Sequence, residues 1–222
     1  MTLAGLVVAV AVFLVAACSE TRYVPISETP PDEDELAWLS RVVAFERDPR
    51  LLSEPPRCVL LQPPTGEAVD PHLAIIVEET LLRHLARRTP RTVTGSYRDR
   101  LAREHGLSLA RAADILRLAE VARCDSVLEA RIGHSDAFYA VVFAGYRLGL
   151  DLRLIRVANG ITLWRAHHVA GRTDGGLPLG LSAVTSAWSA TSLVHDEEAV
   201  HSLVDDLARR LFVTWPATTV AR

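Results

Sequence analysis

The chain of 222 residues contains no lysine, and all 24 of its basic residues are arginine. The absence of lysine excludes chemistry that needs a Schiff-base lysine or a lysine that cradles phosphate. The formal net charge is only −3, whereas a dedicated nucleic-acid binder is usually strongly basic. The composition, 49% hydrophobic and 23% charged, is that of a globular protein. We therefore expect a folded domain that does not bind nucleic acid.

Cysteine is scarce too, and the three cysteines are too few for a disulfide-rich scaffold and too scattered for a zinc site. The sequence contains no G-x-S-x-G, Walker, G-x-G-x-x-G or H-E-x-x-H motif. His167 and His168 are neighbours in a predicted strand, so their side chains point to opposite faces and cannot chelate one ion. We expect a protein that is not an enzyme and that has no cofactor and no metal site. Four serines lie at near-helical spacing, but no His or Asp is placed beside them, so they do not indicate a serine hydrolase. They are Ser182, Ser186, Ser189 and Ser192.

The first seventeen residues have the composition of a signal peptide. Leu3 to Ala17 form an uncharged apolar run, which is shorter than the roughly 20 residues of a membrane-spanning helix. The sequence Leu-Val-Ala-Ala-Cys at 14–18 resembles a bacterial lipobox, although no Arg or Lys precedes the apolar run. The resemblance implies removal of residues 1–17 and attachment of lipid to Cys18. An uncleaved anchor helix or a buried core helix is the alternative.

The residue after Cys18 predicts the destination of such a lipoprotein. It is Ser19, and not the Asp that holds many lipoproteins at the inner membrane. The resemblance therefore implies an anchor in the outer membrane on its periplasmic side, with the outer leaflet of the inner membrane as the other destination. The expected partners are the membrane and other envelope proteins, which leaves room for a homo-oligomer.

Residues 18–57 are predicted to be a tether, because they combine several prolines with the acidic run at 32–35. Within the tether, apolar residues at helical spacing predict a short amphipathic helix at 34–46. We expect this helix to dock either on the main domain or on a partner or membrane.

Residues 58–216 are predicted to form one α/β domain, with a tail at 217–222. Apolar runs and alternating patterns predict strands at 58–62, 91–94, 126–132, 139–157 and 161–170. Helices are predicted from Pro71 to Pro90, from Tyr97 to Glu104, after the N-cap Ser108, and from near Asp196 to Pro216. We expect a three-layer unit with a mixed sheet of order 2-1-3-4-5, three parallel strands, an antiparallel hairpin, and helices on the faces.

The register of the hairpin follows from its apolar residues. A loop of three residues at 158–160, with Gly160 in the left-handed conformation, pairs Leu154 with Trp164 and places Asp151 opposite His167 on the solvent-exposed face. A loop of two residues would instead pair Leu154 with an arginine. The hydrophobic pattern therefore predicts the three-residue loop.

Two segments carry a resemblance to a known group. The resemblance rests on the order of the predicted elements and on two sequences, Arg-Cys-Asp-Ser-Val-Leu at 123–128 and Asn-Gly-Ile-Thr-Leu-Trp at 159–164. Together they resemble the small periplasmic lipoproteins related to the curli-secretion lipoprotein and to the amino-terminal domain of the Tol-system propeller protein. The resemblance covers roughly residues 55 to 214 and concerns the fold more than an activity.

A disulfide is predicted between Cys58 and Cys124, since Cys18 is committed to lipid and the signal peptide implies an oxidising compartment. Both cysteines lie at the starting ends of strands that are neighbours in the predicted sheet. Two independent buried thiols are the alternative.

One stretch of the chain is rich in arginine. It is either a solvated helix edge or a patch that binds an anionic partner. Its members are Arg83, Arg87, Arg88, Arg91, Arg98, Arg100 and Arg103.

Three functions are compatible with these features. The first is a non-enzymatic lipoprotein that acts as an accessory or assembly subunit of a secretion or transport complex in the cell envelope. The second is a lipoprotein that regulates peptidoglycan synthesis, for which the tether is only moderately long. The third, a periplasmic hydrolase, is disfavoured by the missing motifs.

Overall fold

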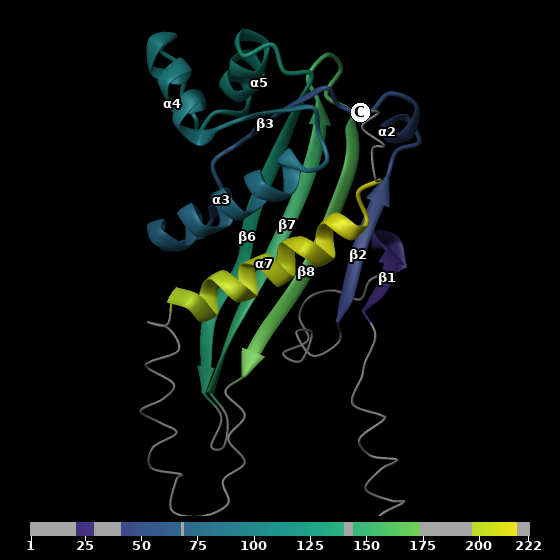
Figure 1. The fold of residues 1–222 in the computed structure, drawn as a ribbon, viewed down its shortest axis with the longest axis vertical. Coiled ribbons are helices and arrows are strands. Elements are labelled where there is room, and N and C mark those ends of the chain that lie inside the picture. The colour runs from purple at the N-terminus through teal and green to yellow at the C-terminus, as the bar shows by residue number, and fades with distance from the viewer. Residues whose placement is uncertain (1–20, 29–40, 68, 140–143, 174–196, 217–222) are drawn as a thin grey trace, which may run out of the picture.

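A computed structural model describes residues 21–28, 41–67, 69–139, 144–173 and 197–216 (Figure 1). The strands are β1 (Arg22–Pro25), β2 (Val42–Arg47), β3 (Cys58–Leu61), β4 (Thr65–Gly66), β5 (Arg91–Val93), β6 (Ser126–Tyr139), β7 (Ala144–Arg156) and β8 (Thr162–Thr173). The helices are the 3₁₀ helix η1 (Ile26–Glu28), α2 (Arg50–Ser53), α3 (Pro71–Ala86), α4 (Gly95–Glu104), α5 (Ala112–Val121) and α7 (Glu197–Val213). Within these residues no helix is long and apolar enough to cross a bilayer.

The strands form one mixed sheet in the order β1-β2-β8-β7-β6-β3-β5, and the short β4 pairs with β6. The predicted order 2-1-3-4-5 corresponds to β5-β3-β6-β7-β8 and is confirmed. The first three of these strands are parallel, and β7 and β8 form the antiparallel hairpin. Two strands that were not predicted, β1 and β2, extend the sheet beyond β8.

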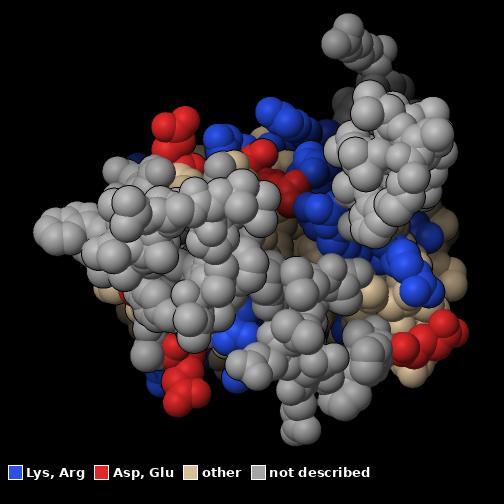
Figure 2. All heavy atoms as spheres, turned by 90° about the horizontal axis from the view of Figure 1, so that it is seen from below, with Lys and Arg blue, Asp and Glu red and all other residues tan. Residues whose placement is uncertain are grey.

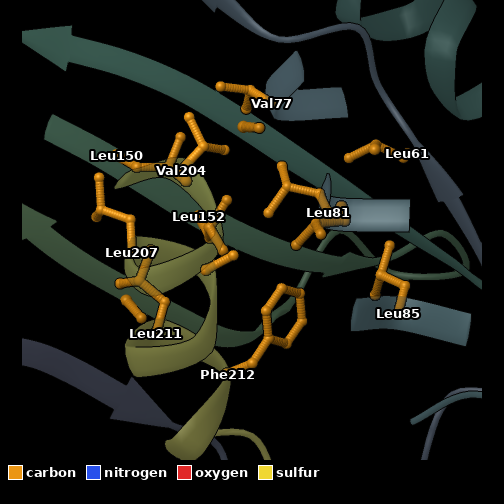
Figure 3. Close-up of a cluster of buried hydrophobic side chains, with 14 of the residues drawn as sticks. Leu61, Val77, Leu81, Leu85, Leu150, Leu152, Val204, Leu207, Leu211 and Phe212 are labelled. Carbon is orange, nitrogen blue, oxygen red and sulfur yellow. The ribbon is translucent and has the colours of Figure 1, made fainter. Parts of the chain in front are cut away.

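One face of the sheet packs against α3 and α7, where leucines of β7 meet apolar residues of both helices (Figure 3). Trp164 of β8 is fully buried there against the rings of Phe212 and Trp215. Its indole N–H donates to the hydroxyl of Thr214 at 2.9 Å. The core residues drawn in the figure and labelled are Leu61, Val77, Leu81, Leu85, Leu150, Leu152, Val204, Leu207, Leu211 and Phe212.

The opposite face of the sheet is covered only at one end. There α4 and α5 pack over β3, β5 and the start of β6, around a second core that includes Leu60, Leu118 and Val127. The protein is therefore three-layered at this end. Farther along, β6, β7, β8 and β2 turn a polar face away from α3 and α7.

The predicted hairpin register is confirmed from Leu148 to Leu154, but the three-residue loop is wrong: the register shifts between Leu154 and Ile155, so that Ile155 pairs with Thr162 and the loop is longer. Leu154 pairs with Trp164, Leu152 with Ala166, Leu148 with Ala170, and Asp151 with His167. Gly160 has the predicted left-handed conformation, with a φ of +68°. The β7–β8 hairpin consequently has one apolar and one polar side.

Two helix starts differ in how well they were predicted. α3 begins as expected, because the carboxylate of Asp70 accepts a hydrogen bond from the backbone N–H of His72 at 2.8 Å. The prediction that Ser108 is the N-cap of α5 is wrong, because α5 begins at Ala112 and Ser108 lies one turn before it. The backbone N–H of Ser108 instead donates to the carboxylate of Asp114 at 2.9 Å.

The predicted helix at 34–46 is wrong where the structure describes it, and 34–40 lie outside the described residues. Val42–Arg47 form strand β2, which pairs with the edge of β8. Over so few residues an apolar pattern does not distinguish a helix from a strand, and β8 offers backbone hydrogen bonds that a docked helix would leave unpaired. The predicted tether at 18–57 therefore contributes β1, β2 and α2 to the domain.

Candidate functional site

The polar face of the sheet is hollowed into an open groove of about 750 Å³. Its floor is formed by β6, β7, β8 and β2. Ile26 of η1 lines it from one side, and Ala110 and Ala112, at the start of α5, from the other. We call this hollow the sheet groove.

A row of four charges crosses the sheet groove from strand to strand. Glu129, Arg153, Arg165 and Glu46 follow one another in the strand pairing, so both acids lie at the ends and both arginines in the middle. Nη2 of Arg153 lies 2.6 Å from a carboxylate oxygen of Glu129, and Nη2 of Arg165 lies 2.5 Å from one of Glu46. The strand pairing sets the order of these four charges across the sheet.

A second row lies beside the first and contains Arg131, Asp151 and His167. Nδ1 of His167 is 2.8 Å from a carboxylate oxygen of Asp151. Arg131 is exposed and makes no ion pair with another part of the described chain. Arg131 lies opposite Asp151 in the strand pairing, and the carboxylate of Asp151 contacts His167.

The sequence predicts Asp151 opposite His167 but does not by itself indicate a site there. The signal was present in β7, where charged residues alternate with leucines, and the confirmed register brings these charges together with those of β8. The contribution of Glu46 was missed because β2 was predicted to be helical.

The seven arginines of the predicted patch do not form one surface. Arg98 lies inside the protein, 3% exposed, because it pairs with Glu78 and Asp99. The guanidinium of Arg91 donates to backbone carbonyls of Ala122 and Arg123. The remaining five lie on α3, just after it, or on α4: Arg83, Arg87, Arg88, Arg100 and Arg103.

The cysteines occupy two parts of the chain. Cys18 lies outside the described residues, so its lipidation stays a prediction. Cys58 and Cys124 are joined by a disulfide in the structure, with Cα atoms 4.6 Å apart and both residues buried.

The two neighbouring histidines point to opposite faces, as predicted. His167 lies in the sheet groove, whereas His168 is buried on the side of α7. Among the described residues no cluster of three His, Cys, Asp or Glu side chains could hold a metal ion.

His168 links three elements in the core. Its Nδ1–H donates to the backbone carbonyl of Val42 in β2 at 2.8 Å, and Nη1 of Arg210 in α7 lies 3.4 Å from its Nε2. Burial lowers the pKa of His168 to about 4, the hydrogen bond to Val42 opposes this shift, and the charge of Arg210 adds to it. Burial also lowers the pKa of His84, against the opposing effect of Asp205.

We expect the stability of the domain to fall as the pH is lowered below about 6.5. As the pH falls, His168 is protonated in the unfolded chain before it is protonated in the folded one. The free energy of unfolding therefore decreases by about 2 kcal/mol between pH 7 and pH 5. Chemical denaturation at both pH values measures this difference, and His168→Gln should reduce it while His105→Gln, an exposed control, should not. An unchanged pH dependence in His168→Gln would contradict the assignment.

No protein-family model matches the chain, and no curated protein matches it. Among solved structures, lipoprotein GNA1162 from Neisseria meningitidis is 17% identical, with a TM-score of 0.46 over 64% of this chain and 100% of that one. A PelC dodecamer from Paraburkholderia phytofirmans is 16% identical, with a TM-score of 0.42 over 76% and 95% of the two chains. The C-terminal domain of LpoB from Salmonella enterica is 16% identical, with a TM-score of 0.39 over 51% and 82%. Similarities of this size do not indicate a function. The resemblance to the curli and Tol proteins stays a prediction.

Proposed function

We propose that the chain is a lipid-anchored protein of the bacterial cell envelope that binds other proteins and catalyses no reaction. Lipid on Cys18 would anchor it to the outer membrane on the periplasmic side, in keeping with Ser19. The α/β domain would serve as an accessory or assembly subunit of a secretion or transport complex.

The proposed binding of other proteins is supported by the pattern of charge in the sheet groove. Paired strands fix Glu129, Arg153, Arg165 and Glu46 in one row, and Arg131 adds a cation beside it. Charges of both signs on a rigid surface favour a partner with the complementary arrangement, since such complementarity selects partners and fixes their register. The groove is open, so it suits an exposed polar segment of another protein.

Reversing charge inside the groove tests this proposal. We expect Arg153→Glu combined with Arg165→Glu to reduce the recovery of co-purifying envelope proteins about tenfold, which corresponds to roughly 1.4 kcal/mol of binding free energy. The measurement is quantitative mass spectrometry after affinity purification from detergent-solubilised envelopes. Arg117→Glu, an exposed change on α5, is the matched control. Equal recovery with all three proteins would contradict a role for the groove.

The same purification separates the proposal from regulation of peptidoglycan synthesis. Enrichment of peptidoglycan synthases would favour the regulator. The position of β1 supports the first function, because Arg22 already belongs to the sheet and leaves only 19–21 between it and Cys18. Such a short link does not carry the domain far from its membrane.

A further inference from the structure

The middle of the sheet groove holds two arginines that lie opposite each other on neighbouring strands. Arg153 of β7 pairs directly with Arg165 of β8, and their side chains are 53% and 49% exposed. Like charges that lie directly opposite each other destabilise a sheet. The carboxylates of Glu129 and Glu46 belong to the outer strands of this row, β6 and β2, so the two cations remain adjacent. An anion bound between the arginines would relieve their repulsion.

Each of these two guanidinium groups keeps part of its capacity to donate hydrogen bonds. Nε of Arg153 donates to a carboxylate oxygen of Glu129 at 2.8 Å, and Nη2 lies 2.6 Å from the same oxygen. Nε of Arg165 donates to Glu46 at 2.8 Å, and Nη2 lies 2.5 Å from the same oxygen. Within the described part of the chain, Nη1 of either arginine has no hydrogen-bond partner. The two acids therefore orient the arginines and leave N–H donors of the kind that bind carboxylates.

A third arginine lies at a defined offset from this pair. Arg131 is exposed on β6, opposite Asp151, and is therefore diagonal to Arg153 in the pairing of β6 with β7. Diagonal neighbours in an antiparallel sheet are about 7–8 Å apart. Side chains two residues apart on one face of an extended chain are separated by about 7 Å. An extended segment with an acid at every second position would therefore match both Arg131 and the central pair.

The lining of the groove favours an anionic ligand over a cationic one. Besides His167, its charged residues are three arginines and two acids, since Glu46 does not line it. Both lining acids already contact a basic group of the protein, Asp151 the ring of His167 and Glu129 the guanidinium of Arg153. Figure 2 views the protein from below and shows basic side chains gathered on the described part of that surface, with acidic ones among them.

We propose that the sheet groove binds an extended acidic segment of a partner protein, with one carboxylate between Arg153 and Arg165 and a second, two residues farther along, on Arg131. This inference rests on the proposed function and adds the chemistry of the partner to it. A protein presents negative charge through Asp and Glu, so the sequence that the arginines select is acid-x-acid. The groove is open and has a volume of about 750 Å³, which admits a short extended segment rather than a folded domain.

Binding of defined peptides to the full lipidated chain, in a non-ionic detergent, tests this inference. The probe is a peptide of seven residues that carries an uncharged dye and has glutamate at its third and fifth positions among serine and glycine. Matched peptides carry glutamine or lysine at both positions, and another carries the two glutamates next to each other. Fluorescence anisotropy at low ionic strength measures the affinities. We expect the glutamate peptide to bind about tenfold more tightly than the glutamine peptide and severalfold more tightly than the peptide with adjacent glutamates.

Variants of the groove locate the binding site of the glutamate peptide. Arg153→Gln and Arg165→Gln, each alone, should weaken its binding about tenfold. Arg131→Gln should remove its advantage over the peptide with adjacent glutamates, and Arg117→Gln, an exposed change on α5, is the control. The comparison of peptides on the unaltered protein stays decisive if one of these variants fails to fold.

Equal affinity for the glutamate and glutamine peptides would overturn the inference. Tighter binding of the lysine peptide would also overturn it, because the partner would then lie on the acids of the groove. Either result is distinguishable from failure of the proposed function, since charge reversal in the groove would still reduce the recovery of envelope proteins if they bind there by other chemistry.

Discussion

Replacing Arg98 with methionine should lower the free energy of unfolding by about 3 kcal/mol. Arg98 joins α4 to two other elements: its Nη1 donates to the backbone carbonyl of Leu61 in β3 at 2.9 Å and lies 3.1 Å from Glu78 of α3. Its Nε also donates to Asp99 at 2.8 Å. Methionine leaves the largely buried carboxylate of Glu78 and the carbonyl of Leu61 without their partner, and an unpaired buried charge is costly.

Urea denaturation followed by circular dichroism measures this loss. Arg100→Met is the matched control, since Arg100 and Glu104 form an exposed pair and such pairs contribute about 0–1 kcal/mol. The double variant Arg98→Met/Glu78→Leu should recover part of the stability, because it removes the stranded carboxylate. A loss for Arg98→Met no larger than for Arg100→Met would show that the buried pair is not stabilising.

Replacing Cys58 and Cys124 together with alanine should cost about 4 kcal/mol. The bond closes a loop with a sequence separation of 66 residues, and the chain-entropy relation gives this magnitude for a loop of that length. It also ties the start of β3 to the residues before β6 in the core under α4 and α5. We therefore expect the wild-type midpoint to approach that of the variant once a reductant is added.

Thiol labelling of the denatured, unreduced mature protein provides the check. A bridged protein has no reactive thiol when Cys18 carries lipid, whereas two reactive thiols would contradict the bridge. Cys58→Ala/Cys124→Ala should be insensitive to reductant, which separates loss of the bond from a general effect of reducing conditions.

The hairpin and the order of the five central strands could be predicted because each depends on local signals. Leucines alternate with polar residues through β7, and only one register places them opposite the apolar residues of β8. Short apolar runs separated by helical patterns likewise require parallel strands joined by crossovers. The length of the hairpin loop was not predicted correctly, because the bulge between Leu154 and Ile155 leaves no signal in the hydrophobic pattern.

The edge strands and the site could not be predicted in the same way. β2 is defined by its pairing with the distant strand β8, and β1 by its pairing with β2; a six-residue apolar pattern does not contain that information. The arginines show the same limit: Arg98 is adjacent in sequence to exposed residues, yet Glu78 and Asp99 make its burial favourable. The charge rows of the sheet groove likewise arise from four strands, and only the register brings them together.

The mass of the amino-terminal peptide from protein purified out of the membrane fraction reports directly whether the chain is anchored by lipid. We expect a mature chain that begins at Cys18 and carries lipid on its thiol and amino group, and a Cys18→Ala variant that keeps residues 1–17. A chain that retains residues 1–17 in the wild type, or one with an unmodified Cys18 thiol, would contradict a lipid-anchored envelope protein.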